Sequence, residues 1–484
     1  MNKRASLSRR RFIGGIAAAA TVGAASSLLQ ACAPAAPAPE PTKPAAAAPA
    51  KPAEPTKAPE PAKPTEAPKP AAAATPTPAA AAKPAAKQTQ FTYQARIGVQ
   101  AEHFDHFGKL FMEKYPHIKY VPQHIPGTEW RQKVMVQAAA GTLPDAIWMM
   151  SIGLFGQLAK KGTFIDHGPL VKAHNFDLKV FYQAAVDGMT VEGKLYSIPW
   201  IVHPSRAGLY YNKPLFDAAG VKYPDEKWTY EDLTAAALAL TKRSGGKVEQ
   251  YGYMGCHDMW CHIIPIRAYG GDYLSPDGKK VTIDTPEATK AIQEAIADPI
   301  SKHKVSPTPD MVEGGTPQMF ASKKLAMFQS GYWGASQLYQ YAKDIPWGVA
   351  PMPKQKNGKL GMFEIDGNSV TKSAKDPEAA FLYCAFVSSK EAGIDIAQRG
   401  SVPGGRPDVW ESKELSEKPH HVVFTKIIAE CPGLLLPANY RENEFSTTYQ
   451  KGFDPIVFGK ETDAAKVIKE MTPVLQEILD KPVD

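Results

Sequence analysis

The chain has 484 residues and a formal net charge of +7 at pH 7. Most of this charge lies near the N-terminus, because the residues before Cys32 carry +5 and residues 33–88 carry +3, which leaves −1 for residues 89–484. A nearly neutral body argues against the basic surfaces typical of nucleic-acid and membrane-surface binding, so neither partner is expected. Its length is enough for two packed lobes of ordinary size.

The first 31 residues have the pattern of an export signal. Arg9 and Arg10 precede Phe12, an apolar stretch rich in Ala and Gly covers residues 13–29, and Cys32 follows a small residue. The arginine pair resembles the twin-arginine signal, and Cys32 fits the lipobox of lipoproteins, in which this cysteine becomes lipidated. The apolar stretch is shorter than the ~20 residues of a membrane span. We therefore predict a signal peptide over residues 1–31 and a lipid anchor on Cys32.

Residues 32–88 are predicted to be the lipidated cysteine and a tether. From residue 33 onward this segment consists almost only of Ala, Pro, Lys, Thr and Glu, and it contains no apolar residue larger than Ala before Phe91. Such a composition cannot bury a core. The expected location is the outer side of the cytoplasmic membrane, in the periplasm or on the cell surface, with the lipid as the only membrane contact.

Helix-like and strand-like segments alternate at the start of the body. Residues 91–99, 117–121 and 146–150 are predicted to be strands, and residues 130–140 a helix. Phe104, Phe107, Leu110 and Phe111 recur at helical spacing and predict a helix after the first strand. This βαβαβ order favours a parallel sheet with helices on its faces. Ligands of such sheets bind beyond the carboxyl ends of the strands.

Six separated motifs then follow in a characteristic order. They are GTLPDA at 141–146, GKLYSIP at 193–199, LYYNK at 209–213, WTYEDL at 228–233, WGVAPMP at 347–353 and DPEAA at 376–380. Their order and spacing resemble those of the extracellular solute-binding proteins of ABC importers, family 1, the sugar and maltodextrin-binding type.

This resemblance implies an α/β, two-lobe, periplasmic-binding-protein-like fold with discontinuous lobes and a hinge. Lobe 1 would take about 89–206 and 367–438, and lobe 2 about 209–362 and 441–484. It further implies a monomer that holds a sugar or oligosaccharide between its lobes, delivers it to the permease subunits of an ABC transporter, and needs no cofactor. The hinge is expected near residues 205–209, 363–368 and 437–443.

Candidate ligand-binding residues are mainly aromatic, because sugars present apolar faces that stack on flat rings. Trp333 is the leading candidate, since it follows an apolar strand at 325–328 in a segment that supplies a stacking ring in the resembled family. The other candidates lie near strand or helix ends: Trp148, Met149, Trp200, Trp260 and Trp130. Trp228, Trp347 and Trp410 are expected to be structural.

Four charged residues are candidates for contacts with solute hydroxyls. Glu364 and Asp366 replace the Gly-rich pattern that the resembled family usually has at this crossing, and Arg406 and Arg441 are expected at the cleft edge. His203 and Arg206 closely follow Trp200. No catalytic residue and no metal ligand is assigned.

The segment CHDMWCH at 256–262 allows three interpretations. Two Cys, two His and one Asp could supply zinc ligands, although the spacing is not that of a CxxC knuckle. Cys256 and Cys261 could form a disulfide. Ordinary packing with a ligand contact from Trp260 is the third interpretation, while Cys384 lies in an apolar helical run and is expected in the core.

A secreted hydrolase and a structural surface lipoprotein are the two alternative function classes. A secreted carbohydrate-active hydrolase would need paired carboxylates, which no local motif reveals. The usual motifs of a nucleophile elbow, a zinc protease helix and a P-loop are absent from the sequence. A structural surface lipoprotein would not need the six motifs. The sequence therefore favours a binding protein over an enzyme.

Overall fold

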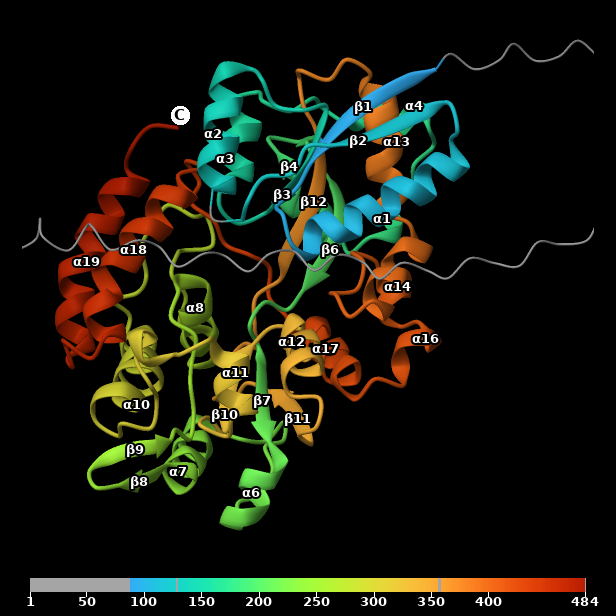
Figure 1. Ribbon diagram of the computed structural model, residues 1–484. Coiled ribbons are helices and arrows are strands. Elements are labelled where there is room, and N and C mark those ends of the chain that lie inside the picture. Colours follow the sequence, from blue (N-terminus) through green and yellow to red (C-terminus); the bar gives the residue numbers. More distant parts are fainter. Residues whose placement is uncertain (1–87, 128, 356–357, 484) are drawn as a thin grey trace, which may run out of the picture. The chain divides into compact units, whose positions relative to one another are not determined.

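The computed structural model describes residues 88–127, 129–355 and 358–483 (Figure 1). The predicted signal peptide, the lipidation site Cys32 and the tether lie outside these residues. Within the described ranges, no helix is both long and apolar enough for a membrane crossing. The mixture of helices and two main sheets confirms the α/β, two-lobe prediction.

The first main sheet has five strands in the order β2-β1-β3-β12-β6. Their bounds are β1 Thr89–Gln94, β2 Ile118–Pro122, β3 Ala146–Met150, β6 Ile198–His203 and β12 Glu364–Val370. β1 pairs in parallel with β2 and β3, as the βαβαβ order predicts. β12 is antiparallel to both β3 and β6, so the sheet is mixed rather than purely parallel. The first strand also ends earlier than predicted, because helix α1 already begins at Val99.

The second main sheet has three strands in the order β10-β7-β11, with β7 antiparallel to both neighbours. These strands are β7 Gly208–Asn212, β10 Met327–Ser330 and β11 Trp347–Pro351. Two short hairpins complete the strands of the described residues: β4 Thr190–Val191 with β5 Lys194–Leu195, and β8 Lys242–Ser244 with β9 Lys247–Gln250.

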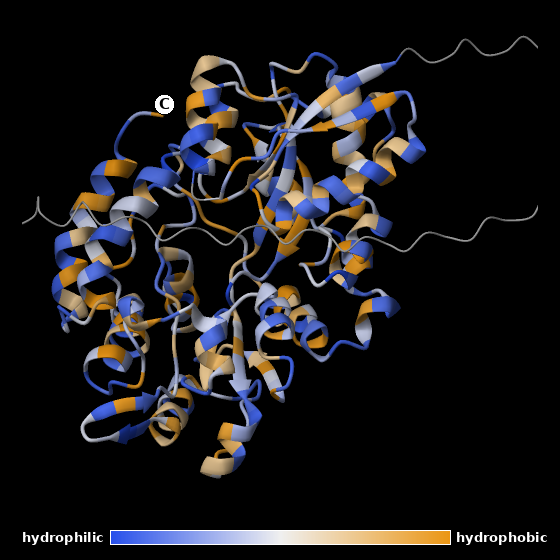
Figure 2. Cartoon of the chain, in the orientation of Figure 1, coloured by the Kyte–Doolittle hydropathy of each residue, from blue (hydrophilic) through white to orange (hydrophobic). Residues whose placement is uncertain are grey.

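Helices cover both sheets, and many of them carry both hydrophilic and hydrophobic residues (Figure 2). Those before the second sheet are α1 Val99–Lys114, α2 Trp130–Ala140, α3 Phe155–Lys160, α4 Gly168–Ala173 and α5 Gln183–Gly188, with η2 Leu178–Val180. Those between β7 and β11 are α6 Lys213–Ala219, α7 Tyr230–Leu240, α8 Met259–Ala268, α9 Pro286–Ala291, η3 Ile292–Ala297, α10 Asp298–Ser301, η4 Pro309–Met311, α11 Thr316–Ala321 and α12 Trp333–Tyr341. After β12 come α13 Pro377–Val387, α14 Lys390–Gln398, α15 Pro407–Trp410, α16 Lys413–Ser416, α17 Pro419–Glu430, α18 Glu442–Val457 and α19 Ala464–Leu479.

Segments far apart in the sequence pack on the same sheet. Helices α1 and α13 pack together and against strands of the first sheet. Helix α13 buries Cys384 there, as predicted. Helices α18 and α19 pack against each other and near α8 and η3. Helix α17 lies within the segment 367–438 that the sequence assigns to lobe 1, yet it packs against β11 of the three-stranded sheet.

The connections around the two sheets contain residues with left-handed backbone. Only residues 204–207 separate β6 from β7, and Ser205 among them is fully buried with φ 46°. Gly361 between β11 and β12 has φ 76°, and Tyr440 just before α18 has φ 61°. Such angles are uncommon for residues other than Gly and indicate a conformation that the surrounding structure imposes.

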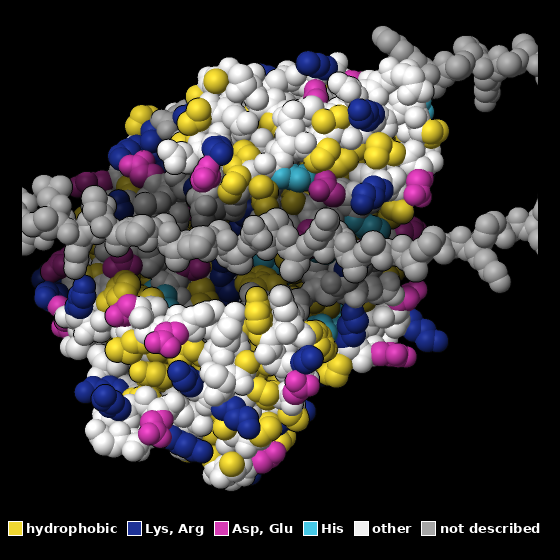
Figure 3. Space-filling model, in the orientation of Figure 1, with side chains coloured by type: hydrophobic (Ala, Val, Ile, Leu, Met, Phe, Trp, Pro, Cys, Tyr) yellow, Lys and Arg dark blue, Asp and Glu magenta, His cyan; other side chains and the backbone are white. Residues whose placement is uncertain are grey.

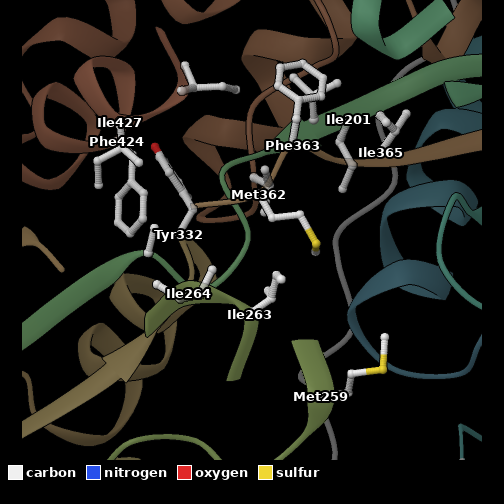
Figure 4. Close-up of a cluster of buried hydrophobic side chains, with 14 of the residues drawn as sticks. Ile201, Met259, Ile263, Ile264, Tyr332, Met362, Phe363, Ile365, Phe424 and Ile427 are labelled. Atoms are coloured by element: carbon white, nitrogen blue, oxygen red, sulfur yellow. The ribbon is translucent and has the colours of Figure 1, made fainter. Parts of the chain in front are cut away.

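A buried apolar cluster lies beside these connections (Figure 4). Ile201 of β6 lies next to Ile365 of β12 and near Phe363. Met362 lies between this group and Ile263 of α8. The cluster therefore brings the connection before β12 into one hydrophobic core with both the first sheet and helix α8.

Candidate functional site

The candidate site lies at one edge of the first sheet. Because β1, β3 and β6 run in the same direction, their carboxyl ends meet at the edge where the antiparallel β12 begins. Arg96 lies just beyond β1, His203 ends β6, and Glu364 begins β12. This is the edge at which open α/β sheets bind ligands.

Strand geometry aims several of these side chains at one face. Glu364 and Asp366 are two residues apart on β12, so their side chains project to the same side of the sheet. Glu364 pairs with His203 of β6, while Asp366 pairs with Met150 and Asn368 with Trp148 of β3. Directly paired residues of antiparallel strands share a face. Met149 pairs with Gly367 and therefore belongs to the opposite face.

An ion pair and an aromatic ring form the centre of the site. Arg206 Nη1 lies 3.1 Å from Glu364 Oε2, and both side chains are largely buried. The Arg206 guanidinium also lies 5.5 Å from the centre of the Trp333 ring, within the range of a cation–π contact. The His203 ring meets the same indole edge to face at 5.3 Å. Trp333, the leading candidate from the sequence, is therefore placed against both polar residues that precede β7.

A glycine makes this placement of Trp333 possible. Gly331 lies two residues before Trp333, at the end of β10. A Cβ atom on Gly331 would lie 2.2 Å from the Trp333 ring, closer than any side chain permits. The sequence GYWG at 331–334 thus turns the indole back over the strand end, towards His203 and Arg206.

A second aromatic group surrounds Asp366. The Trp148 indole N–H donates to Asp366 Oδ2 over 3.1 Å, and the ring centre lies 5.1 Å from that of Trp130 and 5.2 Å from the Arg96 guanidinium carbon. Burial, together with the nearby Glu364 carboxylate, raises the pKa of Asp366 well above its usual range. Asp366 therefore favours its protonated form, which can donate as well as accept a hydrogen bond.

A pocket of about 360 Å³ lies between helices α2, α8 and α18. Its lining includes Trp260 of α8, Asn443 of α18 and Arg131 of α2, whose guanidinium donates to the Asn443 side chain. Neighbouring Glu442 is buried, and burial raises its pKa to about 7. Trp260 thus lines a pocket that also contains polar groups of α2 and α18.

A disulfide resolves the alternatives for the 256–262 segment. Cys256 and Cys261 are bonded, with their Cα atoms 5.5 Å apart. With both thiols used, the segment no longer offers four zinc ligands. The loop that the bond closes contains Asp258, which caps α8 through Cys261 N and lies 3.8 Å from Arg206, and Trp260.

Four of the candidate residues do not lie in the group formed by Trp333, Arg206, Glu364 and Asp366. Met149 and Trp200 are buried in the core, and the Trp200 ring packs on Phe104 at 4.4 Å. Arg406 pairs with Asp408, two residues further along, at 2.8 Å. Arg441 pairs with Glu444 and donates to the carbonyl of Pro482. Local partners thus occupy both arginines, and the strand alternation and packing remove Met149 and Trp200.

Three residues of the site were not singled out from the sequence. Arg96 could have been found, because it directly follows a predicted strand and so lies at the binding edge of the sheet. Asp258 is the N-cap of α8, and the sequence suggested it only as a zinc ligand, not as a contact of Arg206. Arg131, within α2, carries no signal in the sequence.

Known proteins resemble this chain over most of its described length. The family of bacterial extracellular solute-binding proteins matches residues 78–394. A lactose-binding protein of Rhizobium radiobacter is 22% identical over 378 residues, which cover 73% of this chain and 84% of its own. A binding protein of Brucella abortus is 25% identical over 316 residues, or 63% of this chain and 72% of its own.

Solved structures show the same fold. An ABC substrate-binding protein of Listeria monocytogenes in complex with cycloalternan is 25% identical with a TM-score of 0.71, covering 81% of this chain and 99% of that one. A maltose-bound protein of T. maritima, 23% identical, has a TM-score of 0.69 and covers 81% of this chain and 100% of that one. Since the family match spans well over half of the sequence, this protein belongs to the bacterial extracellular solute-binding proteins, which bind a solute rather than transform it.

Proposed function

We propose that this protein is the lipid-anchored solute-binding component of an ABC importer and captures a carbohydrate-like solute between its two lobes. The observation that carries the proposal is the meeting of Trp333 with the Arg206–Glu364 pair, where the chain passes between the two main sheets. An aromatic ring beside fixed charged groups suits the apolar face and the hydroxyls of a sugar.

The solutes of the relatives support the same class. A lactose-binding protein resembles this chain in sequence, and proteins in complex with cycloalternan or maltose resemble it in fold. The polar groups here include Asp366, Asp258 and Arg96, in addition to the ion pair. We propose that these residues, with Trp148, Trp130 and Trp260, bind the hydroxyls and ring faces of the solute.

A panel of mono- and oligosaccharides tests this proposal. The purified full chain is incubated with each sugar, and its thermal transition and the sugar products are measured. Stabilisation without any product is the expected result, because ligand that binds only the native state raises the transition temperature. Product formation would favour a hydrolase. Stabilisation by none of the sugars would contradict the carbohydrate assignment.

Closure of the lobes is the expected response to the solute. We propose lobe 1 at about 89–206 and 367–438, apart from helix α17, which packs on β11, and lobe 2 at about 209–362 and 441–484. The hinge would lie near 205–209, 363–368 and 437–443. Groups on both lobes contact one solute together only in the closed form, which gives the differential contact that shifts an equilibrium. Small-angle scattering should show a smaller radius of gyration at saturation with the sugar that binds. An unchanged radius would rule out hinge closure.

The lipid anchor gives a separate prediction. Cys32→Ala is expected to release the protein from the membrane, since the only membrane contact we propose is the lipid on this cysteine. Carbonate extraction of wild type and variant measures this, with Cys384→Ala, which alters a buried cysteine, as the matched control. Retention of the Cys32 variant in the membrane fraction would show that another segment anchors the chain.

A further inference from the structure

We propose a binding site for one divalent transition-metal ion, such as Zn²⁺ or Mn²⁺, formed by His203, Glu364 and Asp366. One potential ligand atom from each of these residues lies within 4.8 Å of the other two. All three residues are at most 5% exposed. The inference goes beyond the proposed function, because no step in the capture of a sugar requires a metal ion.

His203, Glu364 and Asp366 all lie on strands, so no ligand depends on the conformation of a loop. Glu364 and Asp366 project from the same face of β12, and His203 is the direct cross-strand partner of Glu364 on β6. A strand–strand pair holds such side chains in fixed register. An ion at this point would join the end of β6, after which the chain enters the three-stranded sheet, to the start of β12, at which the chain returns from it.

Two buried polar atoms at this point have no hydrogen-bond partner. These are His203 Nδ1 and Asp366 Oδ1. A buried polar atom without a partner costs free energy, so each one in a native fold calls for an explanation. A shared metal ion would satisfy both at once. Ligand bonds of about 2.0–2.2 Å bring the ligand atoms to roughly 3–3.5 Å from one another, so the three side chains need to move only slightly inward.

The charges of the cluster are compatible with a cation. Glu364 and Asp366 place two carboxyl groups in one buried region. Arg206 bonds to Oε2 of Glu364 and repels a cation, but a carboxylate has a second oxygen with which to bind the ion.

The chemistry of the three ligands selects the class of ion. One imidazole nitrogen suits Zn²⁺ and other transition metals, whereas Ca²⁺ and Mg²⁺ prefer sites made of oxygen alone. Three protein ligands leave at least one coordination position open. We therefore expect Zn²⁺ and Mn²⁺ to bind more tightly than Ca²⁺ or Mg²⁺.

Calorimetry on the tag-free full chain, first treated with EDTA and then dialysed, tests the inference. Each metal chloride is titrated alone, and one Zn²⁺ ion per chain is expected. His203→Ala and Asp366→Asn should each weaken Zn²⁺ binding at least tenfold. His117→Ala, at a half-buried histidine before β2, should leave it unchanged. Absence of Zn²⁺ binding, or unchanged affinity in both site variants, would overturn the proposal.

Two further measurements keep the outcome decisive. Asp366→Asn preserves the acceptor for the Trp148 N–H, so a normal circular dichroism spectrum is expected. In the event that His203→Ala does not fold, the Zn²⁺ affinity of Asp366→Asn alone tests the proposal. Zinc X-ray absorption should show only nitrogen and oxygen ligands, including one imidazole. A sulfur ligand would place the ion on a cysteine such as Cys431 and overturn the site. Sugar binding measured with EDTA present reports on the proposed function separately.

Discussion

Trp333→Ala is expected to weaken binding of the solute at least tenfold, with little change in the thermal stability of the free protein. Tenfold corresponds to about 1.4 kcal/mol, close to the ~0.5–1.5 kcal/mol that an aromatic contact contributes beyond its area burial. The ring is only partly buried and packs on His203 and Arg206 rather than inside a core. Calorimetry with a sugar that stabilises the wild type measures the loss.

Two further variants, one at Trp333 and one at a different tryptophan, control this experiment. Trp333→Phe keeps a flat ring and should retain more affinity than the alanine variant. Trp228→Ala removes a half-buried indole that packs on Phe216 and should leave the affinity unchanged. Equal affinities of Trp333→Ala and wild type would assign Trp333 a structural role.

Glu364→Ala is expected to lower the free energy of unfolding by about 3–5 kcal/mol, the range observed when one partner of a buried ion pair is removed. Among the described residues, Arg206 would keep only Asp258, whose half-exposed carboxylate lies 3.8 Å away, as an ion-pair partner. Denaturant unfolding measures the change. Because the pair lies at the connection of β6 to β7, solute affinity should fall as well.

An exposed ion pair provides the matched control. Glu313 is 89% exposed and lies 4.0 Å from Lys324. Glu313→Ala should change stability by less than about 1 kcal/mol, since exposed pairs contribute little. A loss for Glu364→Ala no larger than that for Glu313→Ala would show that the buried pair does not stabilise the fold.

Much of the first sheet follows from sequence patterns alone. The helix at 130–140 and the strand at 146–150 have the predicted bounds, because Gly141 has a left-handed backbone that terminates α2. The antiparallel placement of β12 could not be predicted, since it depends on a pairing between segments about 200 residues apart in the chain. Local patterns carry no information about such a partner.

The candidate site was predictable where a side chain is fixed by its own element. Trp333 follows a strand and a glycine, and both features are visible in the sequence. Trp148 and Met149 are adjacent, so only one of them can face Asp366, and the sequence does not indicate which face β12 covers. Arg406 shows the opposite case, because its guanidinium pairs with Asp408, a local partner that the prediction of a solute contact did not take into account.

The left-handed residues Ser205, Gly361 and Tyr440 have a consequence for how the affinity of this protein can evolve. A non-glycine residue in this conformation destabilises the fold by on the order of 1–3 kcal/mol. If the backbone turns at these positions when the lobes close, this destabilisation differs between the open and the closed form. The measured affinity of a protein whose binding-competent form is partly populated scales with that population. A substitution such as Ser205→Gly could thus alter the working range of the transporter without touching any group that recognises the solute. The residues at these connections would then set the affinity for the solute, and the residues that contact the solute would set its identity, so the two properties could change independently.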